Sequence, residues 1–267
     1  MTTLTWIGIL TVALLAGCMS SQTASKEESS AKQTAPLFDA VFSRPSPDTI
    51  PGGQQGEQIR LGYEIVVRTH EYATNYVGNA LTCTNCHLDA GLDPNAASFV
   101  GLSRVYPELN AGAARPITLA DRVNDCFERN LNGKRLPPNS SNLHAVIAYI
   151  DWLSHDIPSG SAVQWRGMPR IQTSRVPDPI NGKKVFKNRC VLCHGTDGQG
   201  TMMAPPVWGQ KSYTTGSEMA RNSVAASFIK ANMPRTRGWA LSDNDAYDVA
   251  AYINSQPRPE RGERVHD

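Results

Sequence analysis

Six cysteines carry most of the chemistry that this 267-residue sequence can perform. Four of them form two C-x-x-C-H motifs, at residues 83–87 and 190–194. The two thiols of such a motif can bond to the vinyl groups of haem, and the adjacent histidine then binds the iron. Because both motifs end in histidine, a zinc site or a redox dithiol is the weaker alternative. We therefore predict two haem c groups, haem 1 and haem 2. Their attachment residues are Cys83, Cys86, Cys190 and Cys193, and their proximal iron ligands are His87 and His194.

Cys126 stands 39 residues after His87, and Met233 stands the same 39 residues after His194. The two sulfur side chains therefore occupy equivalent positions, where a small cytochrome supplies its second iron ligand. A methionine thioether favours Fe(II) and raises the potential, whereas an anionic thiolate stabilises Fe(III). We predict that Cys126 binds haem 1 and Met233 binds haem 2. A thiolate-ligated haem suits sulfur chemistry better than simple electron carriage.

Other side chains are alternative candidates for the second iron ligand of each haem. In the first half they are His144, His155 and Met168, and in the second half Lys230, Met202 and Met203. The last two follow His194 closely in a glycine-rich loop, where we expect them to pack at the haem edge. Cys126 could instead be a structural thiol with no role at the haem, because free cysteines are often buried structural residues.

The composition fits a small cofactor-filled fold. Net charge is only +2, so bulk charge gives no case for nucleic-acid binding, and aromatic residues make up 7% of the chain. There are 21 glycines and 18 prolines, as expected for short helices joined by long loops around a cofactor. The length suits two small domains better than one large core.

The N-terminus reads as an export signal. Residues 4–16 are almost entirely apolar and lead into Leu15-Ala-Gly-Cys18, which resembles a bacterial lipobox. No lysine or arginine precedes this run, so plain secretion and a retained anchor stay as alternatives, although the run is shorter than the ~20 residues of a spanning helix. We predict a signal peptide over 1–17, a lipid on Cys18, and a periplasmic protein anchored to a membrane, the outer membrane being favoured.

The rest of the chain divides into two similar parts. Residues 18–54 are mostly polar and predict a disordered tether. We predict cytochrome domains at 55–162 and 179–267, separated by a linker at 163–178 rich in proline and arginine. Helical periodicity runs over 59–77, 143–153, 182–186 and 242–253. Ser141 and Ser242 are the expected N-caps of the two closing helices, which share the phrase Ala-Tyr-Ile. The predicted fold is all-α, with two tandem class I cytochrome c domains.

The segment 121–134, Asp-Arg-Val-Asn-Asp-Cys-Phe-Glu-Arg-Asn-Leu-Asn-Gly-Lys, resembles that of the di-haem thiosulfate dehydrogenases, some of which act as tetrathionate reductases. The resemblance extends over 56–257 and is specific around Cys126. It implies that haem 1 is the active site, that Cys126 is catalytic, and that haem 2 relays electrons to a c-type cytochrome or similar partner. In several members a lysine precedes the haem 2 methionine and exchanges with it. Asn232 stands there in this chain, so only Lys230 could take that role.

The implied reaction joins two thiosulfates into tetrathionate with release of two electrons, or runs in reverse. Thiosulfate carries two negative charges, so bringing two of these anions together requires cationic side chains. The first candidates are Arg115, Arg122 and Lys134, and the second are Arg104 and Arg129. Arginine offers paired donors to oxyanions, but these residues could equally be surface charges or haem-propionate partners. The rival functions are a pure electron carrier, a subunit that loads thiosulfate onto a carrier protein, and a peroxidase, which needs an open iron site.

Overall fold

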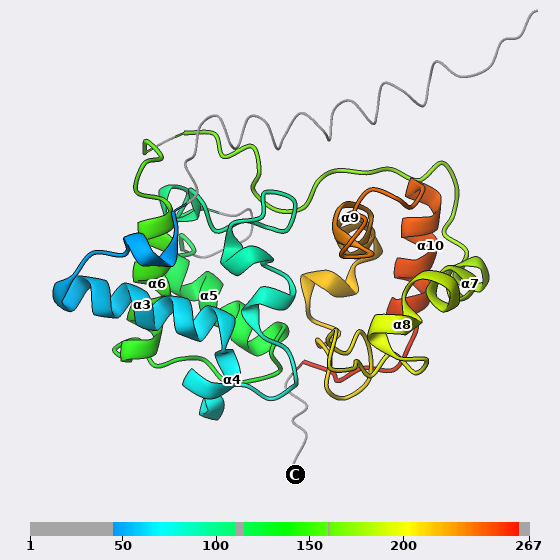
Figure 1. The fold of residues 1–267 in the computed structure, drawn as a ribbon, viewed down its shortest axis with the longest axis horizontal. Coiled ribbons are helices and arrows are strands. Elements are labelled where there is room, and N and C mark those ends of the chain that lie inside the picture. The colour runs from blue at the N-terminus through cyan, green and yellow to red at the C-terminus, as the bar shows by residue number, and fades with distance from the viewer. Residues whose placement is uncertain (1–44, 110–114, 160, 262–267) are drawn as a thin grey trace, which may run out of the picture.

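The computed structural model describes residues 45–109, 115–159 and 161–261. Their regular structure is helical, apart from one isolated bridge between Glu108 and Ile117. Figure 1 shows two helical domains side by side. No helix within these ranges is long and apolar enough to cross a membrane. The predicted signal peptide, Cys18 and most of the predicted tether lie outside the described residues.

The first domain is built on a crossing between α3 (Gly53–Val67) and α6 (Ser141–Leu153). Gly62 allows this crossing, because a Cβ there would lie 2.0 Å from the carbonyl oxygen of Ala145 and 2.7 Å from the Cβ of Tyr149. The domain also contains the short helix α4 (Thr69–Tyr72) and α5 (Leu119–Arg129). Its 3-10 turns are η1 (Pro47–Thr49), η2 (Thr74–Tyr76), η3 (Cys83–Asn85), η4 (Asp89–Gly91) and η5 (Leu102–Arg104).

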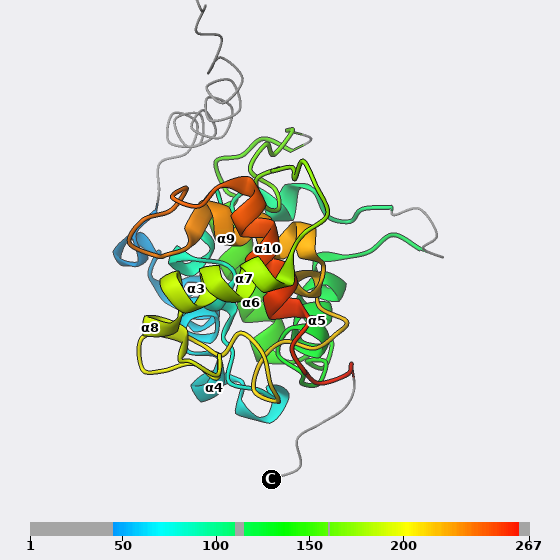
Figure 2. The ribbon, with the colours of Figure 1, turned by 90° about the vertical axis from the view of Figure 1, so that its right-hand side faces the viewer.

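The second domain repeats this crossing. Its helices are α7 (Pro179–Arg189), α8 (Val191–His194), α9 (Asn222–Asn232) and α10 (Asp243–Asn254), with the 3-10 turn η6 (Glu218–Ala220) before α9. A Cβ on Gly182 of α7 would lie 2.0 Å from the Asp248 carbonyl oxygen and 2.9 Å from the Tyr252 Cβ of α10. Figure 2 views the molecule from this domain's outer side, where α7 and α10 lie in front. The prediction of an all-α chain with two similar halves is confirmed for the described residues.

Three local predictions were wrong. The helix expected over 59–77 ends at Val67, because the buried hydroxyl of Thr69 turns away to accept a hydrogen bond from the Cys83 N–H at 3.2 Å. The N-cap of α6 is Ser140, not Ser141, since its hydroxyl accepts from the Leu143 N–H. The end of the predicted tether is also not free, because Ile50 is buried in the first domain's core.

The linker and one tyrosine tie the domains together. The Trp165 indole donates to the Val100 carbonyl at 2.9 Å, and the Thr173 hydroxyl donates to Asn244 in α10 at 2.9 Å. Tyr213 belongs to the second domain by sequence, yet it is 6% exposed and packs within the first domain's core cluster. In Figure 1 α9 is the helix of the second domain nearest the first. The two domains therefore share a packed interface.

Asp248 in α10 holds the start of the second domain. Its side chain is fully buried and accepts from the Arg175 guanidinium (2.6 and 3.0 Å), the Asp178 N–H (2.7 Å) and the Asn181 amide (2.8 Å). Burial alone would raise the pKa of Asp248, but these hydrogen bonds outweigh it and lower the pKa below 3.8.

We expect Asp248→Ala to lower the free energy of unfolding of the protein by about 3 kcal/mol, because a buried charged group with several hydrogen bonds is lost. Since the folded-state pKa is lowered, this contribution is complete above about pH 4 and is lost as pH falls further. Denaturant unfolding of both proteins at pH 7 and pH 3 measures the difference. A loss below 1 kcal/mol at pH 7, or one that grows on acidification, would contradict this.

Candidate active site

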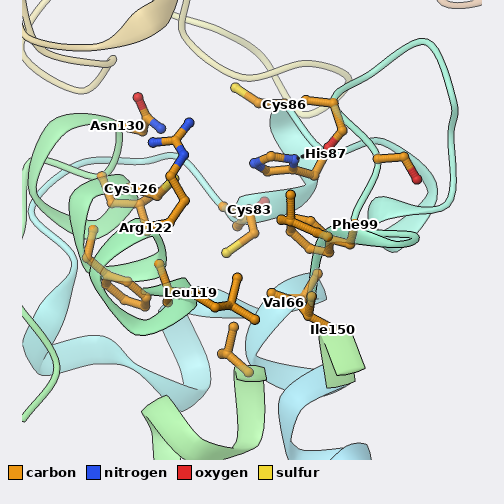
Figure 3. A pocket seen from close by; sticks show the side chains of 18 of the residues that line it. Val66, Cys83, Cys86, His87, Phe99, Leu119, Arg122, Cys126, Asn130 and Ile150 are labelled. Atoms are coloured by element: carbon orange, nitrogen blue, oxygen red, sulfur yellow. Dashed lines mark hydrogen bonds between the residues drawn. The ribbon is translucent and has the colours of Figure 1, made fainter. Parts of the chain in front are cut away.

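A cavity of about 180 Å³ opens in the first domain. One wall carries the attachment motif with Cys83, Cys86 and His87, and the facing wall carries Arg122 and Cys126 of α5 (Figure 3). The remaining lining is mostly apolar and includes Val66, Leu81, Phe99, Leu102, Leu119, Val123, Phe127, Val146 and Ile150. Two thiols beside a histidine, apolar walls and a sulfur opposite are the donor set that haem c needs.

His87 is oriented for iron. Its Nδ1 lies 2.7 Å from the Ala97 carbonyl oxygen, which only accepts, so Nδ1 carries the proton and Nε2 is left for the metal. The Phe99 ring packs against it, with ring centroids 4.4 Å apart. Burial lowers the pKa of His87 to about 4; the Ala97 hydrogen bond opposes this and the Arg122 charge adds to it. The imidazole is therefore neutral at neutral pH, which is its metal-binding form.

Capping at the start of α5 fixes the helix that forms the cavity wall opposite His87. Thr118 caps this helix by accepting from the Asp121 N–H at 3.1 Å, while the Asp121 carboxylate accepts from the Thr118 N–H at 3.0 Å. This reciprocal capping fixes the first turn. Arg122 and Cys126 stand four residues apart on α5, so their side chains share one face of the helix, and both line the cavity.

Arg122 and Cys126 lie beside each other on the cavity wall (Figure 3). The pKa of Arg122 is raised, mainly by its charge interaction with Cys126, against the effect of burial. Within the described ranges its side chain forms no hydrogen bond and no ion pair. Its donors are therefore available to an anion in the cavity, beside Cys126 (Figure 3).

The structure does not bring the other predicted cations into this cavity. Arg115 is exposed and forms a paired contact with Asp121, at 2.7 and 2.9 Å. Lys134 is exposed on the loop after α5. Arg104 donates to the Ser154 carbonyl at 3.1 Å, and Arg129 lies 3.9 Å from Asp125. Of the five predicted cations, only Arg122 lines the described cavity.

Arg166 lines the cavity, although no motif in the sequence predicted a role for it. It lies in the predicted linker and pairs through both terminal nitrogens with Glu108, at 2.8 and 2.5 Å. It also lies over the Tyr106 ring, 5.7 Å from the centroid. The hydrogen bond with Glu108 raises the pKa of Arg166 and lowers that of Glu108. No spacing signal places this residue, because the contact joins the linker to a loop 58 residues earlier.

The alternative ligands for haem 1 lie elsewhere. His144 and His155 are exposed and do not line the cavity. Met168 packs in an interface cluster with Leu88 and Phe228. Cys126 is therefore the one thioether, thiolate or imidazole on the described wall opposite His87.

The second domain presents an equivalent pair. His194 Nδ1 donates to the Pro205 carbonyl at 2.8 Å, and burial lowers the pKa of His194 despite this hydrogen bond. Met233 is half-buried and packs against the core cluster around Phe186 and Trp208, which also contacts Cys190. Burial of Met233 beside the attachment motif fits a haem ligand.

The alternative ligands for haem 2 are either bonded to other groups of the second domain or exposed to solvent. Lys230 donates to the Leu241 carbonyl at 2.7 Å and lies 3.0 Å from Asp243. Met203 is 64% exposed and Met202 is fully exposed, so neither belongs to the buried core of the second domain. Asn232 donates to the Asn95 carbonyl of the first domain at 3.0 Å. These contacts leave Met233 as the predicted ligand.

We expect Met233→Gly to remove the methionine-ligand absorbance of reduced haem 2 and to slow electron exit, while substrate-driven reduction of haem 1 persists. The reason is that loss of the thioether removes the ligand that stabilises Fe(II). Spectra of the reduced protein and stopped-flow reduction measure both effects. Met203→Gly serves as a control on an exposed thioether. An unchanged spectrum in Met233→Gly would move the ligand to Lys230 or the 202–203 pair.

Comparisons with known proteins agree with a chain of two cytochrome c domains. A family model described as SoxA/TsdA, cytochrome c domain, matches residues 70–159, and one described as Cytochrome C oxidase, cbb3-type, subunit III, matches 177–253. Thiosulfate dehydrogenase of Allochromatium vinosum is 40% identical over 80% of this chain and 83% of its own length. That of Psychrobacter arcticus is 39% identical over 85% of this chain and 71% of its own.

A solved structure gives the same picture. Thiosulfate dehydrogenase (TsdBA) from Marichromatium purpuratum, in its as-isolated form, superimposes with a TM-score of 0.78 at 35% identity. The match covers 85% of this chain and 51% of that one, so this chain spans about half of the longer protein.

The helical fold, the two attachment motifs and the two matching family models together define a di-haem c-type cytochrome with two tandem cytochrome c domains. The extent and identity of the matches place it further: the chain belongs to the thiosulfate dehydrogenase family.

Proposed function

We propose that this protein interconverts two thiosulfates and tetrathionate at Cys126, in the cavity between the two walls described above. The observation that carries the proposal is the pairing of Cys126 with Arg122 opposite His87. A cysteine sulfur beside a guanidinium favours the binding and oxidation of a sulfur oxyanion over simple electron carriage. The names of the relatives support the same substrate.

The chemistry assigns one role to each side chain. The Cys126 thiolate and the outer sulfur of one thiosulfate join into a Cys–S–S–SO₃⁻ adduct, with loss of two electrons. The outer sulfur of a second thiosulfate then attacks that adduct, releasing tetrathionate and restoring the thiolate, so Cys126 acts as a covalent catalyst. Arg122 binds the sulfonate oxygens of the dianion through paired hydrogen bonds. When bound, the two haems supply one-electron acceptors that pass electrons to an external redox protein.

The surface near the haem 2 attachment site fits such a partner. Leu192, Met202 and Met203 are exposed, and the Thr201 hydroxyl ties their loop to the Cys193 carbonyl at 2.6 Å. The adjacent helix α7 bears four exposed basic side chains and no acidic one. An apolar centre with a basic rim suits a c-type cytochrome with an acidic surface. We place the protein in the periplasm, held to a membrane by a lipid on Cys18.

Turnover of thiosulfate by the purified di-haem protein with ferricyanide as acceptor tests the proposal. Tetrathionate should form at one molecule per two thiosulfates and two electrons. Absence of turnover would make the protein an electron carrier. Thiosulfate bound to a second protein, without free tetrathionate, would make it a subunit that loads a carrier.

A further inference from the structure

We propose that the second domain positions Cys126, through a clamp formed by residues 212–217 on the C-terminal end of α5. In this view the second domain does more than receive electrons. It also sets how closely the sulfur can approach the iron bound by His87. The inference rests on the proposed role of Cys126, and it makes Thr214 and Ser217 positioning residues for the reaction.

Direct hydrogen bonds join the clamp to the last residues of α5. The Arg129 carbonyl accepts from both the N–H (3.2 Å) and the hydroxyl (2.8 Å) of Thr214. The Asn130 side-chain oxygen accepts from the Ser217 hydroxyl at 2.5 Å. The Asn79 amide bridges the two domains by donating to the carbonyl oxygens of Asn130 (2.7 Å) and Ser212 (2.9 Å).

The clamp is buried and anchored on both sides. Thr214 is 0% exposed and Ser217 is 4% exposed, so their hydroxyls cannot exchange these partners for water at low cost. Ser217 also accepts from the Met219 N–H at 3.1 Å and so begins η6. Met219 packs against the core clusters of both domains and against the cluster between them.

The clamped end lies close to the sulfur along a rigid element. The Cys126 carbonyl accepts from the N–H groups of Asn130 (2.9 Å) and Leu131 (3.1 Å), so the clamped residues close the turn that carries the thiol. Figure 3 shows Asn130, Arg122 and Cys126 on the same wall. Because the α5 backbone is hydrogen-bonded throughout, a shift at its end displaces both the sulfur and the guanidinium relative to His87.

The test uses a matched pair at Thr214 in the holoprotein. Thr214→Val removes the hydroxyl and keeps the shape, whereas Thr214→Ser keeps the hydroxyl. We expect Thr214→Val to convert part of the low-spin electron paramagnetic resonance signal of haem 1 into a second species. It should also lower kcat about three- to tenfold, as expected for one lost buried hydrogen bond, with KM for thiosulfate unchanged. Thr214→Ser should keep the wild-type signal.

Ser217→Ala gives an independent arm and should split the haem 1 signal in the same way. Ser255→Ala is the control, because its hydroxyl donates to the Tyr252 carbonyl within the second domain at 2.8 Å. A wild-type haem 1 signal in both Thr214→Val and Ser217→Ala would overturn the proposal. So would equal changes in the signals of both haems, which would indicate general loosening. The haem 1 signal tests the clamp even if thiosulfate is not the substrate, because this signal depends on iron ligation and not on turnover.

Discussion

Cys126→Gly is expected to lower thiosulfate turnover by roughly a thousandfold or more, because the residue that carries the covalent adduct is removed. Both haems should stay attached, since their thioether bonds involve the cysteines at 83, 86, 190 and 193. Steady-state assays with ferricyanide measure the activity, and the haem content per chain confirms attachment. The methionine-ligand signature of haem 2 should be unchanged, which shows that the second domain is intact.

Cys126→Met separates the two roles of this side chain. A thioether can still bind the iron of haem 1 and should raise its potential relative to the thiolate, but it cannot form the sulfur adduct. We therefore expect a low-spin haem 1 without turnover. Full activity in either Cys126 variant would end the proposal that this cysteine is the catalyst.

Arg122→Ala is expected to lower kcat/KM for thiosulfate about ten- to a hundredfold, because a charge-assisted hydrogen bond contributes on the order of 1.5–3 kcal/mol. Arg122→Lys should restore only part of this loss, since a point charge lacks the paired donors of guanidinium. The haem 1 spectrum should stay close to wild type. Steady-state kinetics over a range of thiosulfate concentrations measure the effect.

Arg115→Ala is the matched control for Arg122. Arg115 has the same charge, but it is exposed and paired with Asp121 outside the cavity. We expect less than a threefold change there, in line with the small energies of exposed ion pairs. If Arg122→Ala instead shifts the haem 1 potential and leaves the kinetics alone, Arg122 is a haem-propionate partner. Arg115 and Lys134 would then become the substrate residues to test.

Local patterns in the sequence predicted the parts of the site that depend on neighbouring residues. The C-x-x-C-H motifs placed His87 and His194. The four-residue spacing within α5 placed Arg122 and Cys126 on one face, and the Ser242 cap began α10 as expected. Each of these depends on helix geometry or on adjacent side chains, which is information that the local sequence contains.

Contacts between distant segments could not be predicted in this way. The Arg166–Glu108 pair joins the linker to a loop, and the Arg115–Asp121 pair removes a predicted substrate residue from the cavity. Thr69 breaks a helix whose apolar spacing continues, because its hydroxyl is used by Cys83. Side-chain partners across loops decide all three, and a periodic pattern does not report them.

The burial of Tyr213 in the first domain's core has a consequence for how the chain unfolds. Separation of the domains would open a hole in one core and expose a phenol ring that is now 6% accessible. The free-energy cost of that separation couples the melting of one domain to the other. Calorimetry of the holoprotein should therefore show a single cooperative transition, and a truncated first domain should melt at a lower temperature than the intact chain. The two halves look like a tandem repeat in the sequence, but we expect them to unfold as one thermodynamic unit.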